Sequence, residues 1–128
     1  MSDFLQHECG IAMLRLKKPL QHYVDKYGTP FYGLNKMYLL MEKQRNRGQD
    51  GVGLANVKLD VPPGNRYLSR SRSTAKQPIE DLFSQVMGRF TDTRKHNPER
   101  LKDADWLQKN HAFTGEVFLG HLRYGTYG

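Results

Sequence analysis

Three stretches of the chain are apolar and extended in character, and they predict β-strands, in which alternate residues share a face. The first strand is predicted over residues 9–16, with the small residues Gly10 and Ala12 on one face, which we expect to be closely approached. The second is predicted over residues 51–59, where two prolines and a glycine end it. The third is predicted over residues 116–124.

Apolar residues at helical spacing predict helices between these strands. A short helix is expected between Pro19 and Gly28. A longer helix follows, with Gly48 as its C-terminal stop. The strongest amphipathic pattern begins behind Pro78, and a further helix is expected to open with Asn97 as N-cap. The apolar stripes of these four helices are Leu20, Tyr23, Val24 and Tyr27; Leu34, Met37, Tyr38 and Met41; Ile79, Leu82, Phe83, Val86 and Phe90; and Leu101, Ala104 and Leu107.

Two further stretches of the sequence can be interpreted. Residues 61–76 are interpreted as a turn and a polar loop. The Gly-Val-Gly of residues 51–53 has no third glycine and no helix after it, so it is not a dinucleotide-binding pattern. We interpret its glycines as small residues that let a helix pack against the strand.

A chain of 128 residues with 38% hydrophobic and 26% charged residues has the size and composition of one globular domain. Its single cysteine excludes an internal disulfide framework, and we expect a cytoplasmic protein with no membrane span. The net charge of +7 is carried largely by basic residues at 66–76 and 89–100. These residues fit a solvated, charged excursion, or alternatively a nucleic-acid surface, although no stacked aromatics accompany residues 66–76.

Cys9 is the candidate catalytic residue of the sequence. The five histidines contain no pair four residues apart, and one cysteine cannot build a thiolate zinc site, so we expect no metal site. Cys9 can be a buried, inert thiol. If residues 1–8 are removed, however, its thiol shares a residue with a free α-amino group, which titrates near about 8 and can act as the base.

Two arginines are candidates for gripping a small carboxylate, because a guanidinium offers two parallel hydrogen bonds. Arg47 lies in the stretch RNRGQDGVG before the second strand, and Arg123 lies in GHLRYGTYG at the end of the third. Each has an alternative role. Arg47 can satisfy helix C-terminal carbonyls, and Arg123 can form a surface ion pair.

Three motifs together resemble one family: Cys-Gly-Ile at residues 9–11, RGQDGVG at 47–53, and the strand end GHLRYGTYG at 120–128. They are similar to the class II glutamine amidotransferases, and the RGQD form with tyrosine after the arginine is most similar to the amidophosphoribosyltransferases of purine synthesis. The resemblance implies an α/β (α+β) N-terminal-nucleophile hydrolase fold, a four-layer αββα sandwich, present here as its N-terminal portion. Residues 60–112 carry no family motif and form a long, basic, partly helical excursion.

The resemblance also implies roles for individual residues. Cys9 would attack the side-chain amide of L-glutamine, and Arg123 would hold its α-carboxylate. Tyr124 and Thr126 would line the same pocket, and Arg47 would help to shape it. Residues 1–8 would be a propeptide cleaved between Glu8 and Cys9, with residues 9–128 forming the N-terminal part of the glutaminase domain.

Other family features have no counterpart among these residues. They are the Asn-Gly oxyanion element, the aspartate that binds the substrate amine, and the phosphoribosyltransferase (synthase) domain, which uses phosphoribosyl pyrophosphate and magnesium. We therefore expect the 128-residue chain alone to be inactive, to contain no cofactor, to partner the absent C-terminal synthase domain, and to form a homo-oligomer. The rival functions are a non-catalytic amidotransferase-like module for assembly or regulation and a basic nucleic-acid-binding domain.

Overall fold

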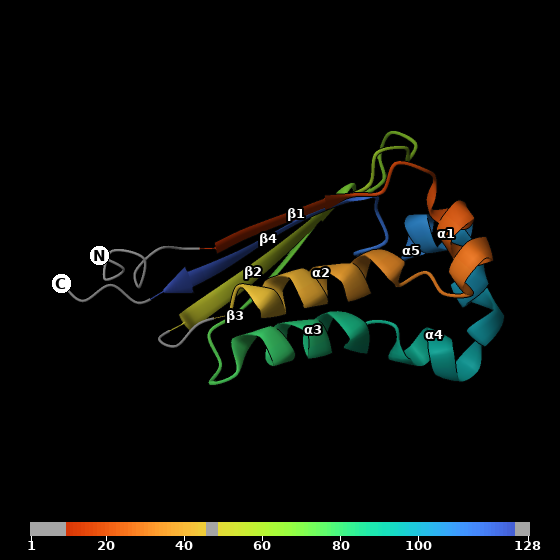
Figure 1. Ribbon diagram of the computed structural model, residues 1–128. Coiled ribbons are helices and arrows are strands. Elements are labelled where there is room, and N and C mark those ends of the chain that lie inside the picture. Colours follow the sequence, from red (N-terminus) through yellow and green to blue (C-terminus); the bar gives the residue numbers. More distant parts are fainter. Residues whose placement is uncertain (1–9, 46–48, 125–128) are drawn as a thin grey trace.

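The computed structural model describes residues 10–45 and 49–124, which form a mixed α/β structure built on one antiparallel sheet (Figure 1). The strand order is β1-β4-β2-β3, so the last strand of the chain lies between the first two. The strands are β1 (Gly10–Arg15), β2 (Gln49–Val57), β3 (Leu68–Ser73) and β4 (Val117–Tyr124). The helices in the described ranges are α1 (Leu20–Tyr27), α2 (Tyr32–Lys43), α3 (Pro78–Gly88), α4 (Thr91–His96) and α5 (Ala104–Asn110), with the 3₁₀ helix η2 (Pro98–Lys102) before α5.

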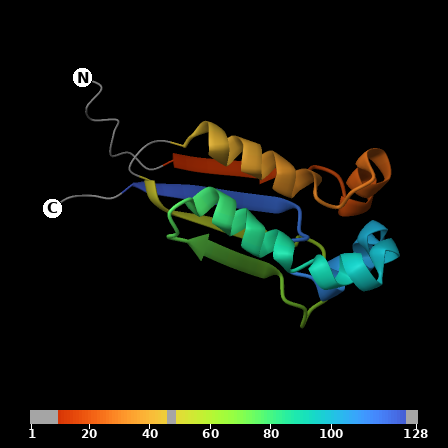
Figure 2. The same ribbon diagram turned by 90° about the horizontal axis from the view of Figure 1, so that it is seen from below.

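Helices α2 and α3 lie side by side on one face of the sheet, α2 over β1 and β4 and α3 over β2 and β3 (Figure 2). Helices α1, α4 and α5 gather beyond one end of the sheet. The core lies between sheet and helices, where burying each large side chain contributes roughly 1.5–3 kcal/mol. Its fully buried members include Met37, Met41, Val52, Leu82, Val86, Phe90, Leu107 and Leu122.

The apolar patterns predict much of this core correctly. The three predicted strands are present as β1, β2 and β4, although β2 begins and ends two residues earlier than expected. Helices α1, α2 and α3 are also confirmed. Gly28 ends α1 with φ of 75°, the left-handed conformation that favours glycine at this position.

The end of α2 differs from the prediction. The helix ends at Lys43 with Gln44 as its cap, well before Gly48. Its last carbonyls accept tighter i to i+3 bonds, from Gln44 N to Met41 O and from Arg45 N to Glu42 O. The side chain of Gln44 also donates to Ile11 O of the first strand.

The predicted polar loop of residues 61–76 is partly wrong, because residues 68–73 form the edge strand β3. Serines 69, 71 and 73 face the helices, and the arginines between them face away from the helices. Ser73 Oγ donates to Asp81 Oδ2 of α3 over 2.5 Å. The strand is therefore attached to α3 by hydrogen bonds in place of apolar contacts.

The single helix predicted to begin at Asn97 is in fact two short helices. Pro98 opens the 3₁₀ helix η2, the Asn97 side chain caps nothing, and α5 starts afresh behind Asp103, which accepts from Trp106 N at 3.1 Å. Helix α4 was not predicted.

Residues 60–112 are not a solvated excursion from the core. They supply β3 and α3, and the buried side chains Ile79, Leu82, Phe83, Val86, Phe90 and Leu107. Their basic residues also take part in packing. The guanidinium groups of Arg89, Arg94 and Arg100 lie 4.9–5.5 Å from the ring centres of Phe113, Phe31 and Trp106, respectively.

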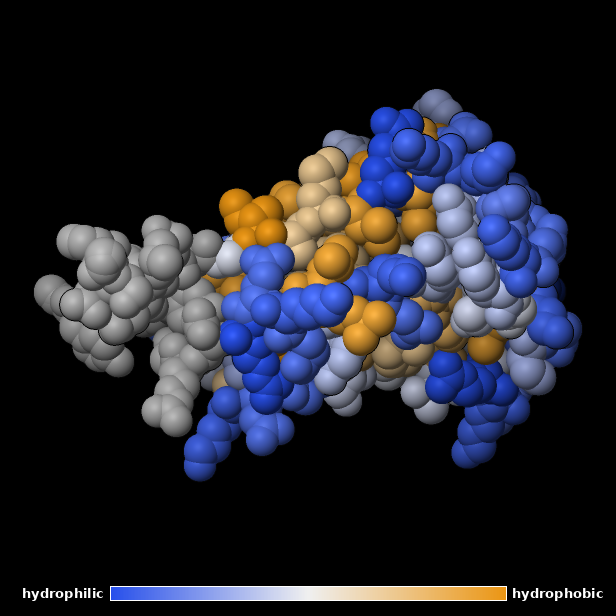
Figure 3. Space-filling view, in the orientation of Figure 1, coloured by the Kyte–Doolittle hydropathy of each residue, from blue (hydrophilic) through white to orange (hydrophobic). Residues whose placement is uncertain are grey.

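The second face of the sheet carries none of the described helices. Its apolar side chains are exposed there: Ile11 by 68%, Met13 by 64% and Leu119 by 49%. Figure 3 shows apolar side chains at the surface over the sheet, bordered by polar ones. The described residues thus form two layers rather than four. None of their helices is both long enough and apolar enough to cross a membrane.

Candidate functional site

The three motif stretches meet at one end of the sheet. Strand β1 begins there at Gly10, β2 begins at Gln49, and β4 ends at Tyr124 (Figure 1). The pairing fixes their neighbours: Gly10 lies opposite Leu122, and Gln49 lies opposite Tyr124. Strand β4 pairs with both β1 and β2, so residues as far apart in the chain as Gly10 and Leu122, or Gln49 and Tyr124, are neighbours in the sheet.

Among the residues predicted to carry chemistry, Arg123 is the one whose side chain the structure describes. It pairs with Gly51 of β2, is exposed, and shares the face of β4 that carries His121 and Leu119. Its side chain makes no ion pair or hydrogen bond with any other described residue. Within those residues, Arg123 is therefore not the surface ion pair of the alternative interpretation.

The other predicted residues are not placed in the same way. Tyr124 is described for its backbone, which closes β4. Glu8, Cys9, Arg47 and Thr126 lie outside the described residues. Arg47 stands four positions beyond the end of α2 in the sequence, and both of its possible roles stay predictions.

The start of β2 contains an irregularity. The register with β4 shifts between Gln49 and Gly51, so Asp50 is an extra residue in this strand. Asp50 is exposed. Such bulges redirect side chains and are frequent beside active sites.

A shallow groove of about 520 Å³ lies on the uncovered face of the sheet, along the middle of β2, β3 and β4. The backbone of Gly53 and Ala55 lies at its floor, between Arg70 and Arg72 of β3 and His121 of β4. A side chain at Gly53 would come within 2.9 Å of His121 Nδ1. The sequence suggested that the glycines of Gly-Val-Gly let a helix pack against the strand. For Gly53 this is wrong, because Gly53 lies against His121 on the face of the sheet that the helices do not cover.

A group of polar residues supports the same end of the sheet from the helix side. Arg45 Nη1 lies 2.9 Å from Glu42 Oε2 and 2.6 Å from Glu80 Oε2, which joins the end of α2 to the first turn of α3. The hydrogen bond with Glu42 raises the pKa of Arg45, and burial raises the pKa of Tyr38 beside them. Sequence analysis missed Arg45 and Gln44, because a charged or polar residue at a helix end gives no signal about which distant element it contacts.

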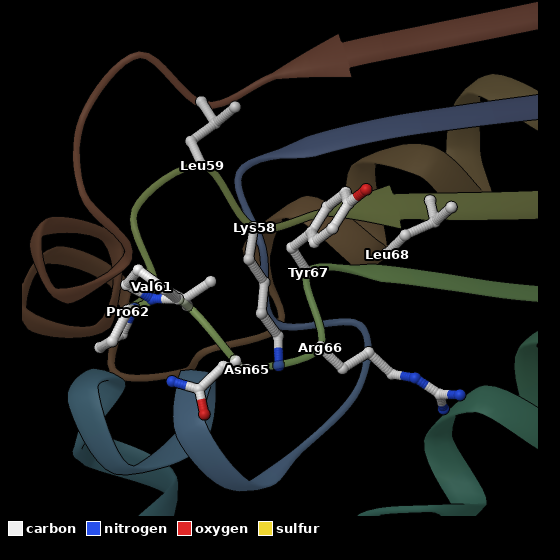
Figure 4. A pocket seen from close by; sticks show the side chains of 10 residues that line it. Lys58, Leu59, Val61, Pro62, Asn65, Arg66, Tyr67 and Leu68 are labelled. Atoms are coloured by element: carbon white, nitrogen blue, oxygen red, sulfur yellow. The ribbon is translucent and has the colours of Figure 1, made fainter.

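A larger hollow, about 850 Å³, lies at the opposite end of the sheet in the loop between β2 and β3 (Figure 4). Lys58 extends its amine across this loop, and Nζ donates to Gln108 O of α5 over 2.6 Å. Burial lowers the pKa of Lys58, and Arg66 lowers it further. Arg66 itself points away from that amine in Figure 4. Because Lys58 has a structural partner and the hollow is far from the motifs, we do not assign chemistry to it.

The described residues contain no group of three His, Cys, Asp or Glu side chains that could hold a metal ion. They therefore offer no ligand set into which magnesium would fit, and no step below uses a metal.

Comparison with known proteins adds no relative. No family model matches the chain, and neither a curated protein nor a solved structure is significantly similar to it. What the chain offers is therefore three short motifs and their meeting at one end of an antiparallel sheet.

Proposed function

We propose that this chain is the glutamine-hydrolysing portion of a class II amidotransferase, similar to the amidophosphoribosyltransferases, with Cys9 as its nucleophile. The observation that carries the proposal is the meeting of the three family-like motifs, through the pairing of Gly10 with Leu122 and of Gly51 with Arg123.

The chemistry is acyl transfer through a thioester. After cleavage between Glu8 and Cys9, the free amine of Cys9 takes the proton of its own thiol, and the thiolate attacks the amide carbon of glutamine. The tetrahedral oxyanion collapses, the carbon–nitrogen bond breaks, and ammonia leaves with the proton. Water then hydrolyses the γ-glutamyl thioester, which yields glutamate and regenerates the thiol.

Arg123 supplies the positive charge for substrate binding. Its guanidinium is exposed and without an ionic partner among the described residues, so it is available to bind the α-carboxylate of glutamine. Tyr124 and Thr126 follow it in the sequence and would line the same pocket, and Arg47, which precedes β2 in the sequence, would help to shape the site.

The uncovered face of the sheet supports the four-layer fold that this function implies. A face that exposes Ile11, Met13 and Leu119 is normally packed against another layer, and two stacked sheets pack about 10 Å apart. In the proposed fold a second sheet of the same domain covers this face, and a further helical layer covers that sheet.

The wider context follows from the family. The ammonia would pass to a synthase domain that uses phosphoribosyl pyrophosphate and magnesium to form phosphoribosylamine, the first step of purine synthesis. We propose a cytoplasmic homo-oligomer for the whole enzyme.

The test is release of glutamate and ammonia from L-glutamine by the protein purified from its native host. We expect turnover in the natural protein and its loss in Cys9→Ala, with Ser71→Ala as the matched control, because that hydroxyl donates to Gln85 of α3 and belongs to no motif. The proposal fails if the natural protein releases no ammonia, or if Cys9→Ala releases it at the natural rate.

A further inference from the structure

The side chain of Gln44 joins the end of helix α2 to the first residues of strand β1. Its amide Nε2 donates to Ile11 O over 3.0 Å. Its amide oxygen Oε1 lies against Gly10: a Cβ atom on residue 10 would come within 2.5 Å of this oxygen. Gln44 thus contacts both residues that open β1.

This contact matters because β1 is an edge strand. It pairs with β4 on one side, and no strand of the described residues pairs with its other side. The start of such a strand is free to fray unless another element holds it. Gln44 holds β1 from the helix layer by its hydrogen bond to Ile11 O, and it packs against Gly10, the residue bonded directly to Cys9.

Gln44 is itself held firmly. It caps α2, and its backbone N–H bonds to Met41 O. The next residue, Arg45, bridges to Glu42 and to Glu80 of α3. Two helices therefore fix the position from which Gln44 reaches β1.

We propose that Gln44 is a positioning residue for the Cys9 nucleophile. It acts by holding Gly10 and Ile11, the start of the strand to which Cys9 is covalently bonded. The inference rests on the proposed function. It assigns Gln44 no contact with substrate and no proton transfer.

The substitution Gln44→Met keeps the length of the side chain and removes both its donor and its acceptor. Gln44→Glu keeps the shape and an acceptor but removes the N–H that Ile11 O receives. Gln21→Met is the matched control, because Gln21 in α1 also uses its amide on backbone groups, those of Lys102 and Ala104, at the far end of the molecule.

Three measurements are made on the mature protein produced in its native host. In both Gln44 variants we expect kcat for glutamine to fall about 5- to 10-fold, the equivalent of one hydrogen bond, with KM unchanged. Cys9 is the only cysteine, so its alkylation by iodoacetamide can be followed by mass. The alkylation rate is measured as a function of pH, and in the Gln44 variants the midpoint of this profile should move toward the pKa of an ordinary thiol, about 8.5. Hydrogen exchange of the peptide spanning β1 should rise.

The control and the outcomes separate this inference from the proposed function. Gln21→Met should leave all three measurements at their natural values. If kcat and the alkylation midpoint are unchanged in the Gln44 variants, or Gln21→Met lowers kcat equally, the positioning role is wrong. If the natural protein hydrolyses no glutamine, the proposed function fails, and the alkylation midpoint alone then tests whether Gln44 positions Cys9. A shift in the Gln44 variants still assigns Gln44 to Cys9, and no shift overturns it.

Discussion

At the scale of single residues, Arg123 is the most informative side chain. It stands near the end of β4, exposed and without an ionic partner among the described residues. A guanidinium has more to offer a substrate carboxylate than an ammonium does, because its planar fork makes two parallel hydrogen bonds. The geometry of the fork, and not its charge alone, is therefore open to test.

We expect Arg123→Lys to lower kcat/KM for glutamine by about 2 kcal/mol, roughly 30-fold, mainly through a higher KM. The lysine keeps the charge but cannot reproduce the fork. Arg72→Lys is the control, because Arg72 is also exposed on the uncovered face but belongs to no motif. Steady-state kinetics of the complete enzyme give the answer, and an unchanged KM for Arg123→Lys would mean that Arg123 is structural.

Maturation is a second test at this scale. The amine of Cys9 can act as a base only when it is free, so activity should require the loss of residues 1–8. We expect active protein from the native host to begin at Cys9. Intact mass and N-terminal sequencing measure this directly. Full activity with Met1 still attached would exclude the amine as base, whereas an inactive native protein that keeps residues 1–8 would favour the non-catalytic module.

At the scale of elements, the sequence predicts those that bury apolar residues and fails for those that do not. Strands β1 and β4 and helix α3 carry clear apolar periods, and all three are present. Strand β3 has the sequence LSRSRS, which alternates with the correct period, but its inward-facing residues are serines. An apolar criterion cannot detect a strand that is attached by Ser73 to Asp81.

His111 holds together the helical end of the molecule. Its Nε2 lies 2.8 Å from Thr93 Oγ1 of α4, and its ring stacks on Phe90 with centres 4.6 Å apart. Burial, and secondly the charge of Lys58, lower the pKa of His111 below its usual 6.5. The folded protein therefore holds this imidazole neutral at a pH at which the unfolded chain binds a proton.

The free energy of unfolding should therefore fall as pH falls below about 6.5, the pKa of the unfolded state, until His111 is protonated in the folded state as well. Above that pH, His111 is neutral in both the folded and the unfolded states, and it no longer changes the free energy of unfolding with pH. Urea denaturation between pH 5 and pH 8 measures it. We expect a weaker pH dependence in His111→Gln, whereas His96→Gln, whose side chain is largely exposed, should retain the natural dependence.

The candidate site was predictable in part. The motifs identify Arg123 from sequence, and the pairing of β4 with β1 and β2 explains why the motifs lie together. The contacts of Gln44 and Arg45 could not be predicted, because they join α2 to β1 and α3 across the fold. Long-range polar contacts of this kind depend on the relative placement of elements and leave no periodic pattern in the sequence.

At the scale of the whole molecule, the two faces of the sheet differ sharply. One is packed against α2 and α3, and the other exposes Ile11, Met13 and Leu119 around a groove edged by Arg70 and Arg72. An apolar face of this kind favours association with another layer. If a second sheet covers it, the exposed residues are interior residues of the complete domain.

The double substitution Ile11→Thr and Met13→Thr should reduce self-association of the 128-residue chain by severalfold and change its unfolding free energy by less than about 1 kcal/mol. Both side chains are largely exposed, so few contacts are lost. Light scattering and urea denaturation measure the two effects. Leu39→Thr is the control, because Leu39 is exposed on α2, away from this face, and equal relief of association by that variant would contradict a special role for the sheet.

The most direct test of the account is covalent trapping on Cys9. The protein purified from its native host is incubated with a diazoketone analogue of glutamine, digested and examined by mass spectrometry. We predict one adduct per chain, located on Cys9, prevented by excess L-glutamine and slowed in Arg123→Lys. Absence of an adduct on Cys9, or an adduct that forms at the same rate with and without glutamine, would contradict a glutamine-hydrolysing thiol at this end of the sheet.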